Sequence, residues 1–125
     1  MNMKAPIRRN LTWLGDTKKK IRSFPDDVKK LIGDELQFIQ FGEIPKDTKP
    51  FKGVGGGTFE IVTPFDTNTY RTVVAVKIGT NIYVLHAFMK KSKKGIATPK
   101  QDVALIKQRL LEAKEIEKLK EKKND

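Results

Sequence analysis

The chain contains no cysteine and a single histidine, His86, among its 125 residues. The missing cysteines exclude disulfides, iron–sulfur clusters, thiolate zinc sites and cysteine nucleophiles. One histidine excludes a multi-histidine metal site, and we expect neither a metal nor a cofactor. No segment approaches the roughly 18 consecutive apolar residues that span a bilayer, and residues 1–10 lack the apolar core of a signal peptide. We therefore expect a soluble, cytoplasmic protein.

Acidic residues are scarce relative to basic ones. The chain has 26 lysines and arginines against 15 acidic residues, a net charge of +11. A small domain with this excess repels itself, which indicates a negatively charged partner. A phosphate-rich partner is the first hypothesis, an anionic membrane surface the second and an acidic protein the third. The length predicts one domain, residues 1–125, with a modest core.

Helices are predicted on both sides of a β-rich segment. Asp16 is a plausible N-cap for a short basic helix over 16–24. Apolar residues at three- and four-residue spacing predict a second helix at about 25–41; they are Val28, Leu31, Ile32, Leu36 and Ile39. Thr98 and Pro99 open a third helix with a capping-box pattern. Its apolar stripe ends at about residue 115, and we expect the basic tail, about 116–125, to fray.

Strand signals lie at 7–15, at 58–65 and at 70–90, where two β-branched runs flank a short turn. Residues 43–57 are rich in proline and glycine and are interpreted as a loop. Strands joined by short turns favour an antiparallel sheet. We therefore predict the α+β class, a small antiparallel sheet with the N-terminal helices and the C-terminal helix packed on one face.

The hairpin at 70–90 brings candidate functional residues together. A two-residue turn would place Arg71 opposite Phe88 and Val73 opposite His86. One face would then carry Arg71, Lys77, His86 and Lys90, and the other a core of Val74, Val76, Ile78, Tyr83, Leu85 and Met89. The first face is a candidate phosphate-binding surface. In the alternative interpretation, His86 is a hydrogen-bonded filler, Phe88 is core and the lysines are merely solvated.

Two basic clusters are candidates for contacts with an RNA backbone. One follows the hairpin and contains Lys90, Lys91, Lys93 and Lys94, and the other contains Lys18, Lys19, Lys20 and Arg22. Solvated surface is the alternative for both. The glycines at 53–57 lack the Gly-Lys-Ser/Thr of a phosphate loop and lead into a strand, so we interpret them as a flexible entry to it.

Three segments resemble the phage-derived branch of the RelE/HigB toxins: "WLGDTKKKIRSFPDDVKK" (13–30), "PFKGVGGGTFEIV" (50–62) and "TYRTVVAVKIGTNIYVLHAFMKKSKKGIATPKQDVALIKQRL" (69–110). The resemblance extends from about residue 8 to 113. It implies the toxin of a type II toxin–antitoxin pair, with a RelE-like fold. Such toxins cleave messenger RNA, usually on the ribosome and without a metal. Their antitoxin partner is commonly a helix-turn-helix protein.

The resemblance also implies roles by position, in a reaction where the RNA 2′-hydroxyl attacks the adjacent phosphorus. Arg71 would stabilise the charge that grows on the phosphoryl oxygens. Lys90 or Lys91 would bind phosphate, or act as base where neighbouring positive charge favours the neutral amine. His86 is a candidate acid or base. Glu60 would hold Arg71 or serve as base; a surface ion pair is the alternative.

Departures from the family pattern keep a second function open. Ile61 and Val62 stand where RelE has an arginine after its strand motif, and no tyrosine lies near the C-terminus. Base stacking would then need Phe88 or Trp13. The alternative is a non-catalytic member that binds RNA, the ribosome or only its antitoxin. A membrane-surface protein is disfavoured by the acidic residues after position 111: Glu112, Glu115, Glu117, Glu121 and Asp125.

Overall fold

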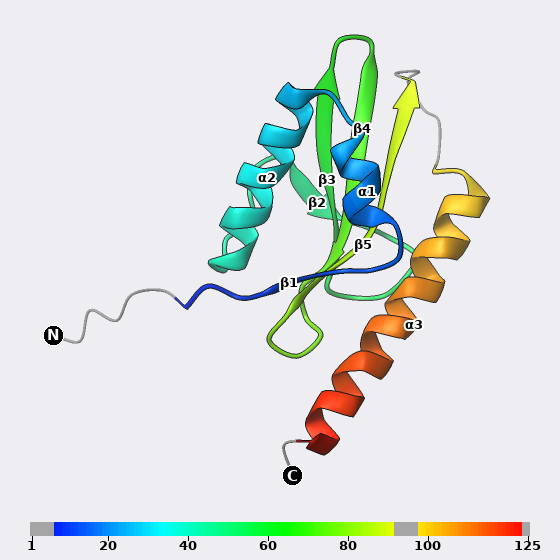
Figure 1. The fold of residues 1–125 in the computed structure, drawn as a ribbon. Helices are drawn as coiled ribbons and strands as arrows, with labels where there is room; N and C mark the ends of the chain where they lie inside the picture. Colours follow the sequence, from blue (N-terminus) through cyan, green and yellow to red (C-terminus); the bar gives the residue numbers. More distant parts are fainter. Residues whose placement is uncertain (1–6, 92–97, 124–125) are drawn as a thin grey trace, which may run out of the picture.

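The computed structural model describes residues 7–91 and 98–123. Its elements are β1 (Leu11–Trp13), α1 (Thr17–Arg22), α2 (Asp26–Gln40), β2 (Thr48–Pro50), β3 (Thr58–Phe65), β4 (Asn68–Ala75), β5 (Ile82–Lys91) and α3 (Lys100–Lys123). The strands form one five-stranded sheet in the order β1-β5-β4-β3-β2. In Figure 1, α1 and α2 lie together in front of the sheet, whereas α3 stands apart from them. This architecture confirms the predicted α+β class.

Two details of the predicted sheet are wrong. The sheet is mixed, because β1 pairs parallel with β5 while the other strand pairs are antiparallel. The helices also cover both faces. Val74 packs in one core with Val28 of α2, and its neighbour Val73 packs in another with Ile106 of α3. Central strands with apolar side chains on both faces need cover on both. Helices on one face alone would leave the apolar side chains of the other face exposed.

The predicted pairs are present near the open end of the hairpin, where Arg71 lies opposite Phe88 and Val73 opposite His86. The predicted two-residue turn is wrong, because residues 76–81 connect the two strands. A β-bulge follows, because Val74 pairs with Val84 and leaves Leu85 as the extra residue. The prediction that Tyr83 and Leu85 share a face with Val74 is therefore wrong. Both pack in the core under α3, because one added residue reverses the alternation beyond it.

Helix α2 agrees with the predicted span to within one residue at each end. Its buried face consists of Val28, Ile32, Leu36 and Ile39. Leu31 was predicted in this face but is 47% exposed. Each residue turns a helix by about 100°, which carries Leu31 out of the buried arc to the side of the exposed Phe38. The three- and four-residue spacing of apolar residues alone does not distinguish the buried side of this helix from its exposed side.

The start of α1 and the end of α3 differ from the prediction. Asp16 precedes α1 as expected, but its side chain makes no capping hydrogen bond. Helix α3 continues to Lys123 instead of ending near residue 115. Beyond residue 115, Ile116 packs against the core between the sheet and α3, and the Tyr83 hydroxyl donates to Glu117. Within the described ranges, no helix is long and apolar enough to cross a membrane.

Candidate functional site

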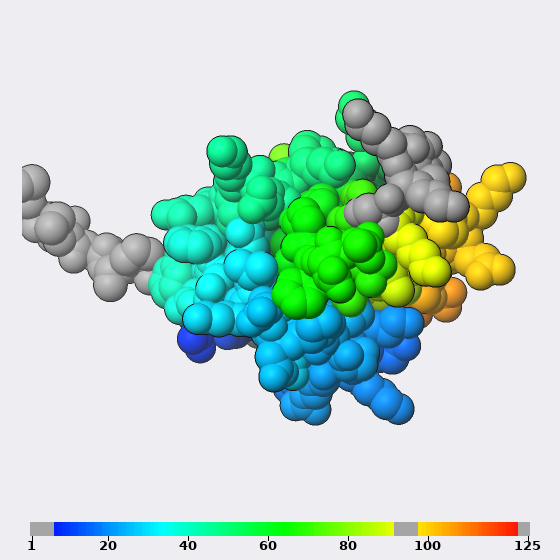
Figure 2. Space-filling view, turned by 90° about the horizontal axis from the view of Figure 1, so that it is seen from above, coloured from blue at the N-terminus to red at the C-terminus, as the bar shows by residue number. Residues whose placement is uncertain are grey.

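A groove of about 400 Å³ lies on the side of the sheet that α3 covers. Its lining combines charged side chains from β2 to β5 with an apolar wall that α3 completes: Lys49, Pro50, Phe51, Lys52, Glu60, Arg71, Lys90, Thr98 and Val103. The segment that contains β2, blue-green in Figure 2, lies at the opposite edge of that view from the blue helix α1. Helix α1 also packs through Ile21 in the core on the α2 side, so the groove and α1 lie on different sides of the sheet.

Strand pairing explains how three charged residues meet in this groove. Glu60 pairs with Val73, and Arg71 pairs with Phe88 in the neighbouring row. Because side chains alternate along a strand, Glu60, Arg71 and Lys90 all project toward the α3 side. Arg71 Nη1 donates a hydrogen bond of 2.7 Å to Glu60 Oε1, and Lys49 Nζ lies 3.8 Å from the same oxygen.

The Glu60–Arg71 pair is largely removed from solvent, since the two side chains are 5% and 19% exposed. Within the described residues, Glu60 Oε2 and Arg71 Nε are buried and have no hydrogen-bond partner. Leaving such atoms unpaired costs roughly 1–3 kcal/mol each, so this arrangement is not explained by stability. A buried polar atom without a partner calls for an explanation, and a catalytic or binding role is one of those open to it.

Lys90 completes the charged part of the groove. Burial lowers the pKa of its amine, and the positive charges of Arg71 and Lys49 lower it further. Glu60 and Asp102 act in the opposite direction by stabilising the ammonium form, and the net pKa lies below the ordinary 10.5. A lysine with a lowered pKa beside a cation-lined groove is suited to proton transfer as well as to phosphate binding.

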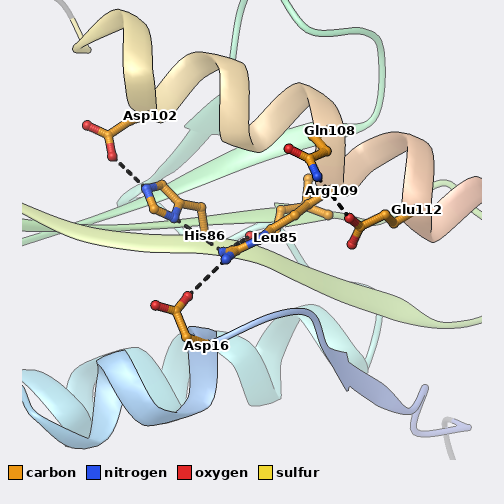
Figure 3. Close-up of polar contacts among 7 residues, drawn as sticks. All are labelled: Asp16, Leu85, His86, Asp102, Gln108, Arg109 and Glu112. Atoms are coloured by element: carbon orange, nitrogen blue, oxygen red, sulfur yellow. Dashed lines mark hydrogen bonds and ion pairs between the residues drawn. The ribbon is translucent and has the colours of Figure 1, made fainter.

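Behind the groove, the buried His86 belongs to a hydrogen-bonded network that Figure 3 shows. Its Nε2 lies 2.7 Å from Asp102 Oδ1, and its Nδ1 lies 3.5 Å from Arg109 Nη1. Arg109 also donates to the Leu85 carbonyl at 2.9 Å and to Asp16 Oδ1 at 2.9 Å. A guanidinium only donates, so this geometry favours the tautomer in which Nε2 carries the proton and donates to Asp102.

The comparison with known proteins shows the family. The model of the family described as "Phage derived protein Gp49-like (DUF891)" matches residues 19–111. The chain belongs to this Gp49-like family. The family is part of the RelE/HigB-like toxin superfamily. No curated protein and no solved structure gives a significant match.

In this Gp49-like chain, the predicted site residues fall into separate places. Glu60, Arg71 and Lys90 meet in the groove. His86 lies beneath α3, where it is 6% exposed and stacks on Phe88 with a centroid distance of 5.1 Å. The alternation of β5 turns the exposed Lys91 toward the opposite face of the sheet.

The two other predicted basic sets are not part of the groove. Lys18, Lys19, Lys20 and Arg22 are exposed on α1, whose Ile21 packs in the core on the α2 side of the sheet. Lys93 and Lys94 lie outside the described residues. Over the ranges that the structure covers, no group of three His, Cys, Asp or Glu side chains is arranged to hold a metal ion.

Sequence reasoning missed several residues in and around the site, among them Asp102, which accepts from His86, Lys49 and Arg109. Lys49 lies in β2, a three-residue strand that was interpreted as loop and that pairs Lys49 directly with Glu60. Arg109 is 8% exposed in α3. A signal for Arg109 was present, because it adjoins the apolar stripe of Ile106 and Leu110, and an arginine there must be paired when buried.

Proposed function

We propose that this Gp49-like protein is the toxin of a type II toxin–antitoxin pair and acts as an endoribonuclease on messenger RNA at the ribosome. Its membership of the RelE/HigB-like superfamily supports the toxin assignment. The observation that carries the enzymatic part is the groove in which the Glu60–Arg71 pair adjoins Lys90. Preorganised positive charge in a groove suits phosphoryl transfer, in which negative charge grows on the phosphoryl oxygens.

The proposed reaction is a metal-independent internal transesterification. The RNA 2′-oxygen forms a bond to phosphorus, and the bond from phosphorus to the leaving 5′-oxygen breaks. A base removes the 2′-hydroxyl proton and an acid delivers a proton to the 5′-oxygen. The products are a 2′,3′-cyclic phosphate and a 5′-hydroxyl, so atoms and charge balance without a co-reactant.

The groove geometry suggests a role for each residue. Arg71 faces the phosphoryl oxygens, where its planar, permanently charged guanidinium offsets the growing negative charge. Glu60 holds Arg71 in place, since its Oε1 already accepts from that guanidinium. Lys90 transfers the 2′-hydroxyl proton, because its lowered pKa makes the neutral amine more available. Lys49 adds positive charge at the side of β2.

Partners follow from the same proposal. The substrate is messenger RNA in the cytoplasm, and Lys91, Lys93, Lys94 and the cations of α1 contact the backbone of the RNA or of the ribosome. A helix-turn-helix antitoxin is the proposed protein partner, and the charge of +11 favours an acidic surface on it.

One observation favours a non-catalytic alternative, a protein that binds RNA, the ribosome or only its antitoxin. Neither of the two aromatic residues proposed for base stacking is positioned to stack on an RNA base in the groove. Phe88 is 6% exposed and stacks on His86. Trp13 packs against the core on the α2 side, away from the groove. Cleavage of RNA by this chain would therefore require that the base is held by other contacts.

The deciding experiment is expression of the chain alone in bacteria, with mapping of messenger 5′ ends. We expect growth arrest and new cleavage sites, both lost in Arg71→Ala and Lys90→Ala. Arg8→Ala and Lys107→Ala are matched controls, because both residues are exposed and lie outside the groove. Absence of arrest in the parent would overturn the toxin assignment. Arrest without new 5′ ends would favour the non-catalytic alternative.

A further inference from the structure

The first turn of α3 forms part of the groove wall and is anchored from beneath. Thr98 and Val103 line the groove. Between them, Asp102 accepts the hydrogen bond of 2.7 Å from His86 on β5. The His86 side chain is 7% exposed and that of Asp102 is 25% exposed. This partly buried bond therefore links the helical wall directly to the strand that carries Lys90.

His86 is itself held from the other side. Arg109 approaches its Nδ1 and also donates to the Leu85 carbonyl at the β-bulge. With Nδ1 facing a donor and Phe88 stacked on the ring, Nε2 is directed at Asp102. The imidazole thus has one well-defined orientation, and α3 is fixed at both Asp102 and Arg109.

We propose that His86 and Asp102 are positioning residues of the groove: their hydrogen bond fixes the α3 wall, and the Asp102 carboxylate adjusts the charge balance around Lys90. This inference rests on the proposed function, since it assigns a role in the same site. Neither residue belongs to the groove lining, so neither is expected to touch the RNA.

Asp102 lies on the same side of the sheet as Lys90, because its partner His86 and Lys90 both project from β5 toward α3. The charges that act on Lys90 come from four elements. Lys49 of β2 and Arg71 of β4 disfavour its ammonium form, whereas Glu60 of β3 and Asp102 of α3 favour it. Glu60 is closely paired with Arg71, so Asp102 is the carboxylate that can be neutralised without releasing Arg71. Neutralising it should lower the pKa of Lys90 further and make the amine neutral at a lower pH.

Two substitutions at one position separate geometry from charge. Asp102→Asn keeps a carbonyl oxygen that accepts from His86 Nε2 but removes the negative charge. Asp102→Ala removes both. Glu112→Gln is the control, because it neutralises an exposed carboxylate on the same helix that contacts Gln108 instead of His86.

The readouts are the NMR titration of the Lys90 amine and RNA cleavage as a function of pH. In Asp102→Asn we expect Lys90 to titrate at lower pH than in the parent and the rising limb of kcat to move by the same amount, with KM unchanged. In Asp102→Ala we also expect kcat/KM to fall by roughly 10- to 100-fold, because the wall is displaced. Glu112→Gln should change neither.

An unchanged Lys90 titration in Asp102→Asn would overturn the charge role. Equal losses in Asp102→Asn and Asp102→Ala, without a shift in the pH profile, would overturn the positioning role of the hydrogen bond. If the parent fails to cleave RNA, the proposed function fails. The titration still decides whether Asp102 controls Lys90, because it needs no activity.

Discussion

The molecule has two basic regions that look alike in composition and differ in construction. On α1, Lys18, Lys19, Lys20 and Arg22 are exposed. In the groove, Arg71 is 19% exposed and paired with Glu60, and the pKa of Lys90 is lowered. Exposed charges are screened by salt and interact weakly, whereas partly buried ones are oriented and strongly coupled. Charge density therefore does not distinguish the two regions, whereas pairing and burial do.

The sharpest test of this difference is removal of Arg71. Arg71→Ala should lower kcat of RNA cleavage by about 10²- to 10³-fold, as expected when one preorganised donor to the reacting phosphate is lost. Arg71→Lys should not restore it, because an ammonium lacks the planar fork. Single-turnover cleavage of ribosome-bound messenger measures the effect. Normal cleavage by Arg71→Ala would remove the groove from the proposed mechanism.

The pH dependence of cleavage tests Lys90 next. As a base, Lys90 reacts in its neutral form, so kcat should rise with pH by up to about tenfold per unit and level off below the pH at which an ordinary lysine titrates. Lys90→Ala should lose this rising limb and should react about 10²-fold more slowly. Lys107→Ala, on exposed α3 surface, is the control. An identical limb in Lys90→Ala would assign the titration to another group.

The cations of α1 should have a smaller effect of another kind. The triple change Lys18→Ala, Lys19→Ala, Lys20→Ala should weaken RNA binding and reduce its salt dependence by about 0.7 per lost contact to single-stranded phosphate, with kcat unchanged. Fluorescence anisotropy at several salt concentrations measures this. A fall in kcat would contradict the distinction between the two basic regions.

The smallest effect is expected where the start of α1 meets α3. The hydrogen bond from Arg109 holds the pKa of Asp16 below its ordinary value of 3.8. Its contribution to stability is present above that value and is lost as the pH falls through the lowered pKa. The Asp16 side chain is 61% exposed, so we expect less than about 1 kcal/mol. Urea unfolding of parent and Asp16→Asn at pH 6 and pH 3 should show the difference shrinking at pH 3.

Several parts of the fold were predictable because their signals are local. Strand β3 was predicted with its observed ends, 58 and 65, and α2 to within one residue at each end, from turn residues and apolar periodicity. The pairing of Arg71 with Phe88 was predicted correctly, although the two-residue turn on which that prediction rested is replaced by a longer connection over 76–81. Glu60 and Arg71 were candidates before their contact was seen, since both stand in strand segments of the resemblance.

Other parts depend on contacts between distant segments. Strand β2 has three residues, too few for a pattern, and becomes a strand only by pairing with β3. The β-bulge at Leu85 places Tyr83 and Leu85 on the opposite face of the sheet from the predicted one, and no turn residue in the sequence indicates the bulge. Lys91 seemed equivalent to Lys90, but alternation separates them once the last strand is known to continue through both.

The sequence by itself determined the α+β class, the excess of positive charge and the residue types available for phosphate chemistry, because these follow from composition, local periodicity and turns. Only the tertiary structure decided that helices cover both faces, that Lys49, Glu60, Arg71 and Lys90 share one groove, and that His86 is held by Asp102 and Arg109. The physical reason is that burial and charge pairing arise between segments far apart in the chain, as with Asp16 and Arg109, 93 residues apart.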